Sequence, residues 1–420
     1  MAELNTGNGI FMVDRRIPVT VEKRRPGTEY RVRIETADEM DQVWGGEIIL
    51  PAAGPGRFLL EDVMTSLEFR HMKKGRPLSA LKMMVFNRLK KSAAGECRRM
   101  FYRLGADSFP VHMTLCSGSR PEDRKSIELR FRAADVEAIP VQGPFTGRFY
   151  RPRDIVTKGS VLVLGGSTGG LAWSDQAAAL LASRGYAALA LSYFDFRGAG
   201  GRPRRLEEIP LEYFKSAIDW LKGETGEDQA GILGISKGAE AALLTASVYA
   251  GDIRSAAAYV PSGYAFEGVY TGRRRNRSSW SLGGKPVPFL SYPEETKLGM
   301  FMREGELLRI HRDALDRADA GTVQAAALPV DRIGCPLLLI SAGRDATWPS
   351  SYMAEDIVRR MEQAGRGGQV IHRDYPGAGH CFQVPGLPPL TDSEAVDAAA
   401  MAKANRQAWD EVLAFFGETV

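Results

Sequence analysis

Short runs of alternating apolar and polar residues fill the first third of the chain. Turn residues bound these runs, and their spacing is typical of an antiparallel sandwich. The clearest runs are 17–23, 30–36, 45–51, 109–118 and 126–132. The basic stretch 71–92 fits either a helix or an irregular crossover between strands. The pattern therefore predicts an all-β domain over residues 1–142.

The pattern changes after residue 142, where continuously apolar runs alternate with segments of helical periodicity. The apolar runs are 161–165, 186–193, 230–235, 256–261, 336–341 and 369–375. The helical segments are 175–185, 210–222, 238–251 and 350–365. Strands that are apolar on both faces and alternate with helices predict a mostly parallel sheet covered by helices on both faces. We thus expect an α/β domain over residues 143–420, preceded by an immunoglobulin-like sandwich.

The alternation stops between about residues 262 and 330, in a segment rich in Gly, Arg, Tyr and Trp. An insertion between late strands predicts a lid over the carboxyl edge of the sheet. Its basic cluster consists of Arg273, Arg274, Arg275 and Arg277. Arginine binds phosphate oxygens in pairs, so the cluster is a candidate contact for an anionic part of a substrate. The alternative is a solvated loop.

The motif G-x-S-x-G, typical of acyl-transfer nucleophiles, occurs twice. Around Ser236 an apolar strand runs directly into the serine, and a helical pattern begins within two residues. This context predicts the sharp strand-to-helix turn that a serine nucleophile needs. Around Ser167 a glycine-rich loop separates the serine from the next helix. That loop is better suited to offer backbone N–H groups to an oxyanion, so we assign the nucleophile to Ser236.

A base and an acid for Ser236 are found in loops that follow later strands. His380 lies in the Gly/Pro-rich segment after the last strand, and Asp345 follows the strand 336–341. The order Ser, Asp, His along the chain is that of α/β-hydrolases. Asp374 and Asp356 are weaker candidates, because one lies at a strand end and the other within a helix. The predicted triad is Ser236, His380 and Asp345.

Each predicted residue has a chemical role. His380 removes the proton from the Ser236 hydroxyl, which raises the rate by about 10²–10⁴. Asp345 holds the imidazole tautomer and stabilises the imidazolium. The backbone N–H groups of Lys237 and of Ser167 or Thr168 are the expected oxyanion donors. We expect the Lys237 side chain, at a helix start, to be solvated.

These segments resemble the acyl-CoA thioesterases and bile acid-CoA:amino acid N-acyltransferases. GILGISKGAE is similar to the nucleophile segment of that family, SAGRDATWPSSYMAEDI to its acid segment and YPGAGH to its histidine segment. The resemblance covers about residues 145–390. It implies a β-sandwich followed by an α/β-hydrolase domain, and a thioester substrate, usually acyl-CoA. A serine nucleophile in this family leans toward hydrolysis, whereas cysteine leans toward transfer to amines.

The composition of the chain argues against several other classes of function. The chain has 55 Lys and Arg against 51 Asp and Glu, a net charge of +4 that is too slight to favour nucleic-acid binding. The four cysteines lack metal-finger spacing, so we predict no metal and no cofactor. The N-terminus lacks the apolar segment of a secretion signal, and no run approaches the roughly 18 apolar residues that span a bilayer. We expect a cytoplasmic protein without a membrane partner.

Three functions remain open besides thioester hydrolysis, and the sequence leaves the oligomeric state undetermined. An acyltransferase would pass the acyl group from Ser236 to an amine or alcohol. An esterase or peptidase would use the same triad on another acyl donor. A non-enzymatic binding module would retain the fold but not the chemistry, which an intact triad argues against. Fold alone does not choose among thioester hydrolysis, acyl transfer and the hydrolysis of esters or peptides.

Overall fold

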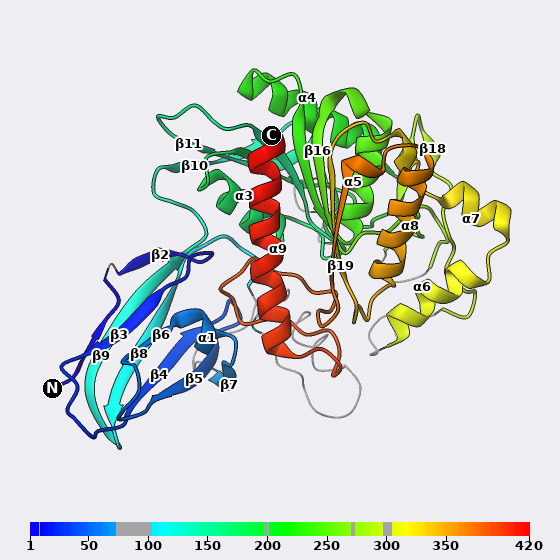
Figure 1. Cartoon of the computed structure of the whole chain (residues 1–420). Coiled ribbons are helices and arrows are strands. Elements are labelled where there is room, and N and C mark those ends of the chain that lie inside the picture. The colour runs from blue at the N-terminus through cyan, green and yellow to red at the C-terminus, as the bar shows by residue number, and fades with distance from the viewer. Residues whose placement is uncertain are drawn as a thin grey trace.

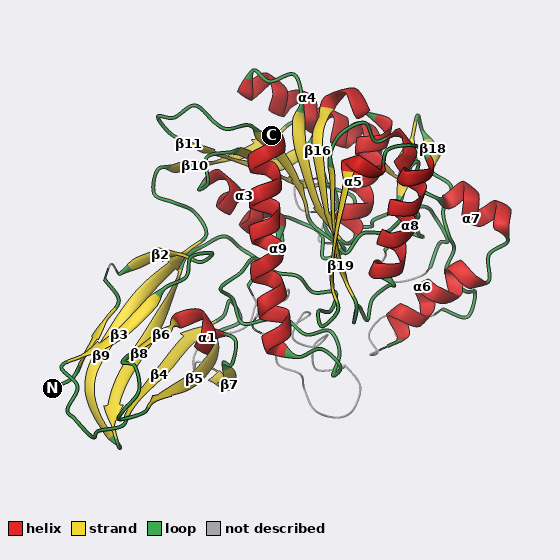
Figure 2. Cartoon of the chain, viewed as in Figure 1, coloured by secondary structure: helices red, strands yellow, loops and turns green. Residues whose placement is uncertain are grey.

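The computed structural model describes residues 1–7, 9–72, 101, 103–196, 198, 201–269, 274–296 and 305–420. Most of the predicted basic stretch 71–92 lies outside these residues, as does Arg273. Figure 1 shows an N-terminal group of strands beside a larger layered body of helices and sheet. Figure 2 shows that strands dominate the first part, whereas helices flank the sheet of the second.

The N-terminal strands form two sheets whose alternate residues are buried, as the period-two pattern predicted. A six-stranded sheet has the order β2-β9-β8-β4-β5-β7, and a three-stranded sheet has the order β1-β3-β6. Val19 and Val21 of the small sheet and Val32 and Ile34 of the large one belong to the same hydrophobic core. The elements are β1 (Glu3–Asn5), β2 (Ile10–Met12), β3 (Pro18–Glu22), β4 (Tyr30–Ala37), β5 (Gln42–Leu50), β6 (Arg57–Leu59), α1 (Leu60–Met64), β7 (Glu68–Met72), β8 (Phe109–Ser117) and β9 (Arg120–Arg130).

An eight-stranded sheet forms the centre of the remaining chain. Its order is β10-β11-β13-β12-β15-β16-β19-β20, antiparallel at β10-β11-β13 and parallel from β13 onward. All six predicted apolar runs after residue 142 are strands of this sheet. Its strands are β10 (Val136–Gln142), β11 (Thr146–Pro152), β12 (Ser160–Leu164), β13 (Ala187–Ser192), β15 (Ala230–Ile235), β16 (Ile253–Tyr259), β19 (Leu337–Ala342) and β20 (Val370–Tyr375).

The strand β10 precedes residue 143 but is hydrogen-bonded into the eight-stranded sheet. The sheets therefore divide between β9 and β10, ahead of the boundary that the sequence pattern suggested. The domain limits 1–142 and 143–420 stay a prediction.

Helices cover both faces of the eight-stranded sheet, which confirms the predicted α/β class. In β12, Val161 and Val163 pack in the core that contains α3 and α9, whereas Leu162 and Leu164 pack in the core of α4, α5 and α8. Alternate residues of one strand thus serve opposite faces, so continuously apolar strands are required. The helices are α3 (Ser174–Ala182), α4 (Leu211–Thr225), α5 (Lys237–Val248), α8 (Ser350–Gln363) and α9 (Ala398–Thr419).

The segment between β16 and β19 forms small elements of its own beside α5 and α8 (Figure 1). A three-stranded sheet joins β14-β17-β18. The segment contains β17 (Trp280–Leu282), β18 (Lys285–Pro286), α6 (Glu306–Asp316), α7 (Ala320–Ala326) and the 3-10 turn η4 (Val330–Arg332). Outside it, β14 (Ile209–Pro210) precedes α4, and the 3-10 turns η2 (Ala250–Asp252) and η5 (Gly367–Gln369) precede β16 and β20. That the segment acts as a lid stays a prediction.

The long helix α9 begins on the side of the N-terminal strands and runs beside the eight-stranded sheet to the end marked C (Figure 1). Its Trp409 Nε1 lies 3.3 Å from the buried carboxylate of Asp14, and Arg184, just after α3, donates to the same oxygen at 3.1 Å from Nε. Arg406 donates to the carbonyl of Asp14 and to Glu61 of α1. Asp14 therefore joins the N-terminal segment to α3 and α9.

Replacing Asp14 tests this junction. Asp14→Ala leaves partly buried Arg184 and buried Trp409 without the carboxylate that accepts their hydrogen bonds, and we expect a loss of about 3 kcal/mol in the free energy of unfolding. Urea unfolding followed by tryptophan fluorescence measures the loss. The control is Glu137→Ala, whose arginine partners are about half exposed and whose removal should cost less than about 1 kcal/mol. Equal losses in both variants would contradict the role given to Asp14.

Candidate active site

Ser236 occupies the turn between β15 and α5 in a backbone conformation that side chains rarely adopt. Its φ is 56° and its ψ is −122°. A Cβ on Gly234 would lie 2.2 Å from the Gly238 carbonyl oxygen, and a Cβ on Gly238 would lie 2.3 Å from the Gly165 carbonyl oxygen. Only glycine fits at either position, so the G-x-S-x-G spacing follows from the close approach of the backbone.

His380 lies between Ser236 and Asp345 and hydrogen-bonds to both. Its Nε2 is 2.9 Å from Ser236 Oγ, and its Nδ1 is 2.9 and 3.0 Å from the two carboxylate oxygens of Asp345. Ser236 is 8% and Asp345 5% exposed. The structure thus brings together the three residues predicted as a triad, in a continuous chain of hydroxyl, imidazole and carboxylate.

Asp345 and Trp348 fix the imidazole from two sides. The Oδ1 of Asp345 accepts the backbone N–H groups of Thr347 at 2.9 Å and Trp348 at 3.1 Å, which orients the carboxylate. The buried Trp348 ring packs edge-on against His380, with 5.6 Å between the ring centroids. Trp348 was not identified as a site residue from the sequence, although it lies in the quoted acid segment.

Neither rival acid is hydrogen-bonded to His380. Asp374, on the edge strand β20, accepts hydrogen bonds from the hydroxyls of Ser341 on β19 and Ser351 on α8. Asp356 accepts from the Tyr264 hydroxyl at 3.1 Å and forms ion pairs with two arginines of its own helix, α8. The choice of Asp345 over both therefore agrees with the hydrogen bonds.

The surroundings of His380 favour its charged form. Burial of the ring opposes protonation, but the charge and hydrogen bond of Asp345, together with the charge of Asp392, outweigh it, and the pKa of His380 is raised. An imidazolium that forms after proton transfer from Ser236 is therefore stabilised. The arrangement suits a general base that holds a proton for a short time and returns it to a leaving group.

The glycine-rich loop after β12 passes beside the candidate nucleophile. A Cβ on Gly166 would lie 3.3 Å from Ser236 Cβ, so the loop approaches the serine closely at this residue. Ser167 and Thr168 are the next two residues of the loop. Lys237 is the first residue of α5, where backbone N–H groups lack partners within the helix. That these N–H groups bind an oxyanion stays a prediction.

The expectation of a solvated Lys237 side chain was wrong. Lys237 is only 2% exposed, and its Nζ donates to Glu240 at 2.9 Å and to Ser279 Oγ at 2.9 Å. Glu240 also accepts from Trp280 Nε1 at 2.7 Å and from the Phe266 backbone. The segment of about residues 262–330, called the insert below, packs over the start of α5. The sequence pattern of a single helix does not reveal that a distant segment buries one of its residues.

Burial disfavours both charges of this pair. It lowers the pKa of Lys237 and raises the pKa of Glu240, and the attraction between the two side chains opposes both shifts. Nearby His311 is also buried, which lowers its pKa to about 4 and keeps the ring neutral at pH 7. The first turn of α5 is thereby tied to the insert through Phe266, Ser279 and Trp280.

The described arginines of the basic cluster have carboxylate partners within the chain. Arg274 pairs with buried Glu267 at 2.6 Å, Arg275 with Glu207 at 3.4 Å and Arg277 with Glu208 at 2.8 Å. These ion pairs connect the insert to itself and to the segment before β14. These contacts give the arginine cluster a structural role. They do not support an anion-binding site at the cluster, which stays a prediction.

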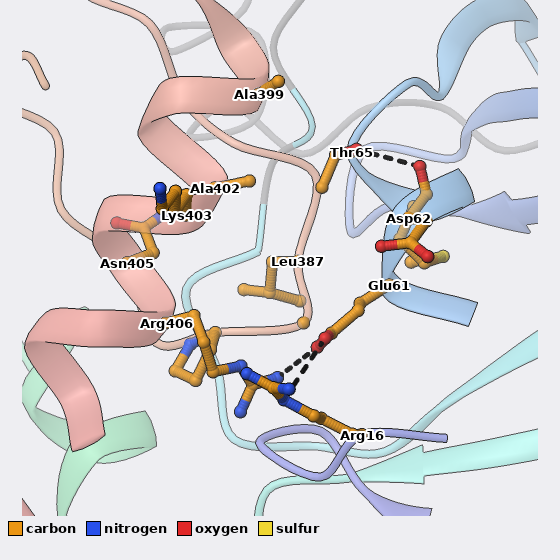
Figure 3. Close-up of a pocket in the computed structure, with 13 residues that line it drawn as sticks. Arg16, Glu61, Asp62, Thr65, Leu387, Ala399, Ala402, Lys403, Asn405 and Arg406 are labelled. Atoms are coloured by element: carbon orange, nitrogen blue, oxygen red, sulfur yellow. Dashed lines mark hydrogen bonds and ion pairs between the residues drawn. The ribbon is translucent and has the colours of Figure 1, made fainter. Parts of the chain in front are cut away.

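A cavity of about 300 Å³ lies away from the predicted triad, between α1, α9 and the residues around Leu387. Figure 3 shows Glu61 directed at both Arg16 and Arg406 at its edge. Among the described residues, no group of three or more His, Cys, Asp or Glu side chains could hold a metal ion. None of the described helices is long and apolar enough to cross a membrane.

A serine, a histidine and an aspartate at the carboxyl edge of this sheet define an α/β-hydrolase. The family described as BAAT / Acyl-CoA thioester hydrolase C terminal matches residues 209–420, and the chain belongs to that family. This confirms the resemblance drawn from the nucleophile, acid and histidine segments.

Individual relatives are similar to most of the chain. Acyl-coenzyme A thioesterase 1 of Rattus norvegicus is 28% identical over 312 residues, 70% of this chain and 68% of the relative. The Mus musculus protein of the same name is 26% identical, and the match spans 63% of its length. Peroxisomal succinyl-coenzyme A thioesterase of Mus musculus is 26% identical over 331 residues, 74% of this chain and 73% of the relative. A solved structure, a dienelactone hydrolase from Klebsiella pneumoniae, matches with a TM-score of 0.41 and 15% identity over 67% of this chain and 99% of its own.

Breaking the buried pair tests the contact between α5 and the insert. Glu240→Ala leaves the buried charge of Lys237 without its carboxylate and the N–H groups of Trp280 and Phe266 without their acceptor, and we expect the free energy of unfolding to fall by about 3–5 kcal/mol. Combining Lys237→Met with Glu240→Gln should recover part of the loss, because no buried charge remains. Asp219→Ala, which removes an exposed partner of Lys215 on α4, is the control. A loss as small as in the control would refute the assigned role.

Replacing Asp345 tests the orientation of the imidazole. Asn at this position can keep the backbone hydrogen bonds of Thr347 and Trp348 but offers an N–H to His380, which favours the wrong tautomer. We expect Asp345→Asn to lower kcat by about 10³–10⁴-fold. Asp374→Asn should leave turnover nearly unchanged. The reverse ranking of the two variants in steady-state kinetics would mean that the acid is misassigned.

Proposed function

We propose that this chain hydrolyses acyl thioesters, with acyl-CoA as the substrate class, through an acyl intermediate on Ser236. The observation that carries the proposal is the hydrogen-bonded chain Ser236–His380–Asp345 in a member of an acyl-CoA thioester hydrolase family. The relatives named above are acyl-CoA and succinyl-CoA thioesterases, which supports the choice of acyl donor.

In the first step, Ser236 Oγ attacks the thioester carbonyl while His380 Nε2 accepts its proton. Negative charge develops on the carbonyl oxygen, and the backbone N–H groups of Lys237 and of Ser167 or Thr168 are the proposed donors to it. Collapse of the tetrahedral species breaks the carbon–sulfur bond. The thiolate leaves and takes the proton from His380, which gives an acyl-serine and a free thiol.

In the second step, water replaces the thiol and His380 again acts as the base. The resulting hydroxide equivalent attacks the acyl-serine carbonyl, the same N–H groups receive the oxyanion, and Ser236 leaves with the proton from His380. The products are a carboxylic acid and the regenerated enzyme. No cofactor or metal takes part in these steps. An amine or alcohol in place of water would make the same intermediate a donor for acyl transfer.

We propose further that the chain acts in the cytoplasm on a small-molecule thioester, without a nucleic-acid or membrane partner. Support for the compartment comes from the sequence alone, and some relatives are named for the peroxisome and the mitochondrion. Imaging of the tagged full chain tests the compartment separately from the activity.

A panel of acyl donors tests the proposed activity. We expect release of free thiol from acyl-CoA esters, slower turnover of nitrophenyl esters and no gain in rate from an added amine acceptor. Ser236→Ala should lower thioester turnover by about 10⁴-fold or more and abolish labelling by a fluorophosphonate. Ser167→Ala should still be labelled, because it retains Ser236.

The outcomes of the panel separate the alternatives. An amide product formed in the presence of an amine would identify an acyltransferase, and esters preferred over every thioester would identify an esterase. Labelling that moves to Ser167, or that persists in Ser236→Ala, would refute the assigned nucleophile.

A further inference from the structure

A single carboxylate, Asp392, bridges the loop of the candidate base and the loop of the candidate acid. Its Oδ2 accepts the backbone N–H of His380 at 3.0 Å and the backbone N–H of Ala346 at 3.1 Å. Ala346 follows Asp345 directly. One oxygen atom therefore fixes the spacing between the two loops whose side chains must meet.

Asp392 belongs to a strap, residues 383–397, that connects the histidine loop to α9. The Gln383 N–H donates to Asn405 of α9 at 3.0 Å, and the Gln383 side chain accepts from Leu390 N at 2.8 Å. The Arg344 guanidinium, next to Asp345, donates to the Ala395 carbonyl of the strap. The strap is thus held both by α9 and by the acid loop.

The second oxygen of Asp392 is packed against the histidine loop. A Cβ on Gly379 would lie 1.9 Å from Asp392 Oδ1, so any larger residue before His380 would displace the carboxylate of Asp392. Oδ1 is buried, and no donor among the described residues reaches it. A buried carboxylate oxygen without a donor is costly, so any favourable contribution of Asp392 comes from its other oxygen or from its charge.

We propose that Asp392 is a positioning residue of this site, which clamps the His380 loop to the Asp345 loop and places a second negative charge beside the imidazole. The inference rests on the proposed roles of Ser236, His380 and Asp345, but not on the identity of the acyl donor.

The charges around the imidazole give this inference a measurable consequence. Among the described residues, the carboxylates of Asp345 and Asp392 face His380, and both raise its pKa. Cys381 and His311 also face this cluster; burial raises the pKa of the thiol and lowers that of His311 to about 4, so both are neutral near pH 7. Burial also raises the pKa of Asp392 itself, and the charge of His380 opposes this shift.

The sign of the pH effect follows from the role of His380. The base must be neutral to accept the proton of Ser236, so the reaction rises with pH through the pKa of His380. Loss of the negative charge of Asp392 lowers that pKa. The acidic limb of the pH profile therefore moves to lower pH when Asp392 becomes neutral.

The experiment uses the full chain and measures the rate at which a fluorophosphonate labels Ser236, by mass spectrometry, from pH 5 to pH 9. Asp392→Asn can still accept both backbone N–H groups through its amide oxygen, so we expect a near-normal rate at high pH and a lower midpoint of the acidic limb. Asp392→Ala removes both hydrogen bonds, and we expect labelling about 10- to 100-fold slower at every pH. Asp374→Ala, which removes a carboxylate hydrogen-bonded to the hydroxyls of Ser341 and Ser351 and not to the His380 loop, is the matched control.

Circular dichroism spectra establish that each variant is folded. A folded Asp392→Ala that is labelled as fast as Asp374→Ala would overturn the clamp, and an unmoved midpoint in Asp392→Asn would overturn the electrostatic role. If Asp392→Ala does not fold, the midpoint of Asp392→Asn decides the inference alone. If the labelling of Ser236 depends on Asp392 as expected but the chain hydrolyses no thioester, the proposed function is refuted and the inference about Asp392 stands. A chain that is not labelled at Ser236 would refute both.

Discussion

The strained turn at Ser236 is the constraint on which the rest of the site depends. A residue held at φ 56° and ψ −122° costs of order 1–3 kcal/mol, so packing around it must prevent relaxation. The Gly234–Gly238 contact closes the turn, and the Ser236 N–H donates to the Tyr259 carbonyl of β16 at 3.0 Å. Glu240 and Lys237 then fasten the next turn of α5 to the insert. The hydroxyl is consequently held at a fixed point above the end of β15.

The order of the strands brings the partners of Ser236 to that point. β15, β16, β19 and β20 are adjacent and parallel, so the loops that follow them open at the same edge of the sheet. Residues 109 and 144 positions away from Ser236 in the sequence thereby become neighbours. The parallel sheet fixes where the loops begin, but not how their tips meet. That second requirement falls to hydrogen bonds between the loops, such as Arg344 N to the Ala378 carbonyl at 2.9 Å.

Much of this arrangement is legible in the sequence because it depends on periodicity and on short local motifs. Strands such as 230–235 are continuously apolar because both faces of the sheet are covered. The strand-to-helix turn at Ser236 has its two glycines, Gly234 and Gly238, within five residues. The pairing of β10 with β11 was not predicted, nor were the lengths of α6 and α9. The burial of Lys237 was missed for a physical reason: its acceptor network includes Ser279 and Phe266, which a local pattern does not connect to α5. Likewise nothing in the strap sequence distinguishes Asp392 from the other acidic residues near it.

The same carboxylate illustrates why the tips of loops resist prediction and yet control chemistry. A histidine on a loop after the last strand has many accessible positions, and fixing one costs about 1–2 kcal/mol of conformational entropy for each residue. Backbone hydrogen bonds to a single shared acceptor reduce the freedom of two loops at once, and the burial of that acceptor strengthens each bond by excluding water. The penalty is a carboxylate oxygen that no donor of the described residues reaches, which is tolerated where the charge also favours the imidazolium. Precision in the Ser236–His380–Asp345 chain is therefore achieved by a residue that touches none of the reacting atoms.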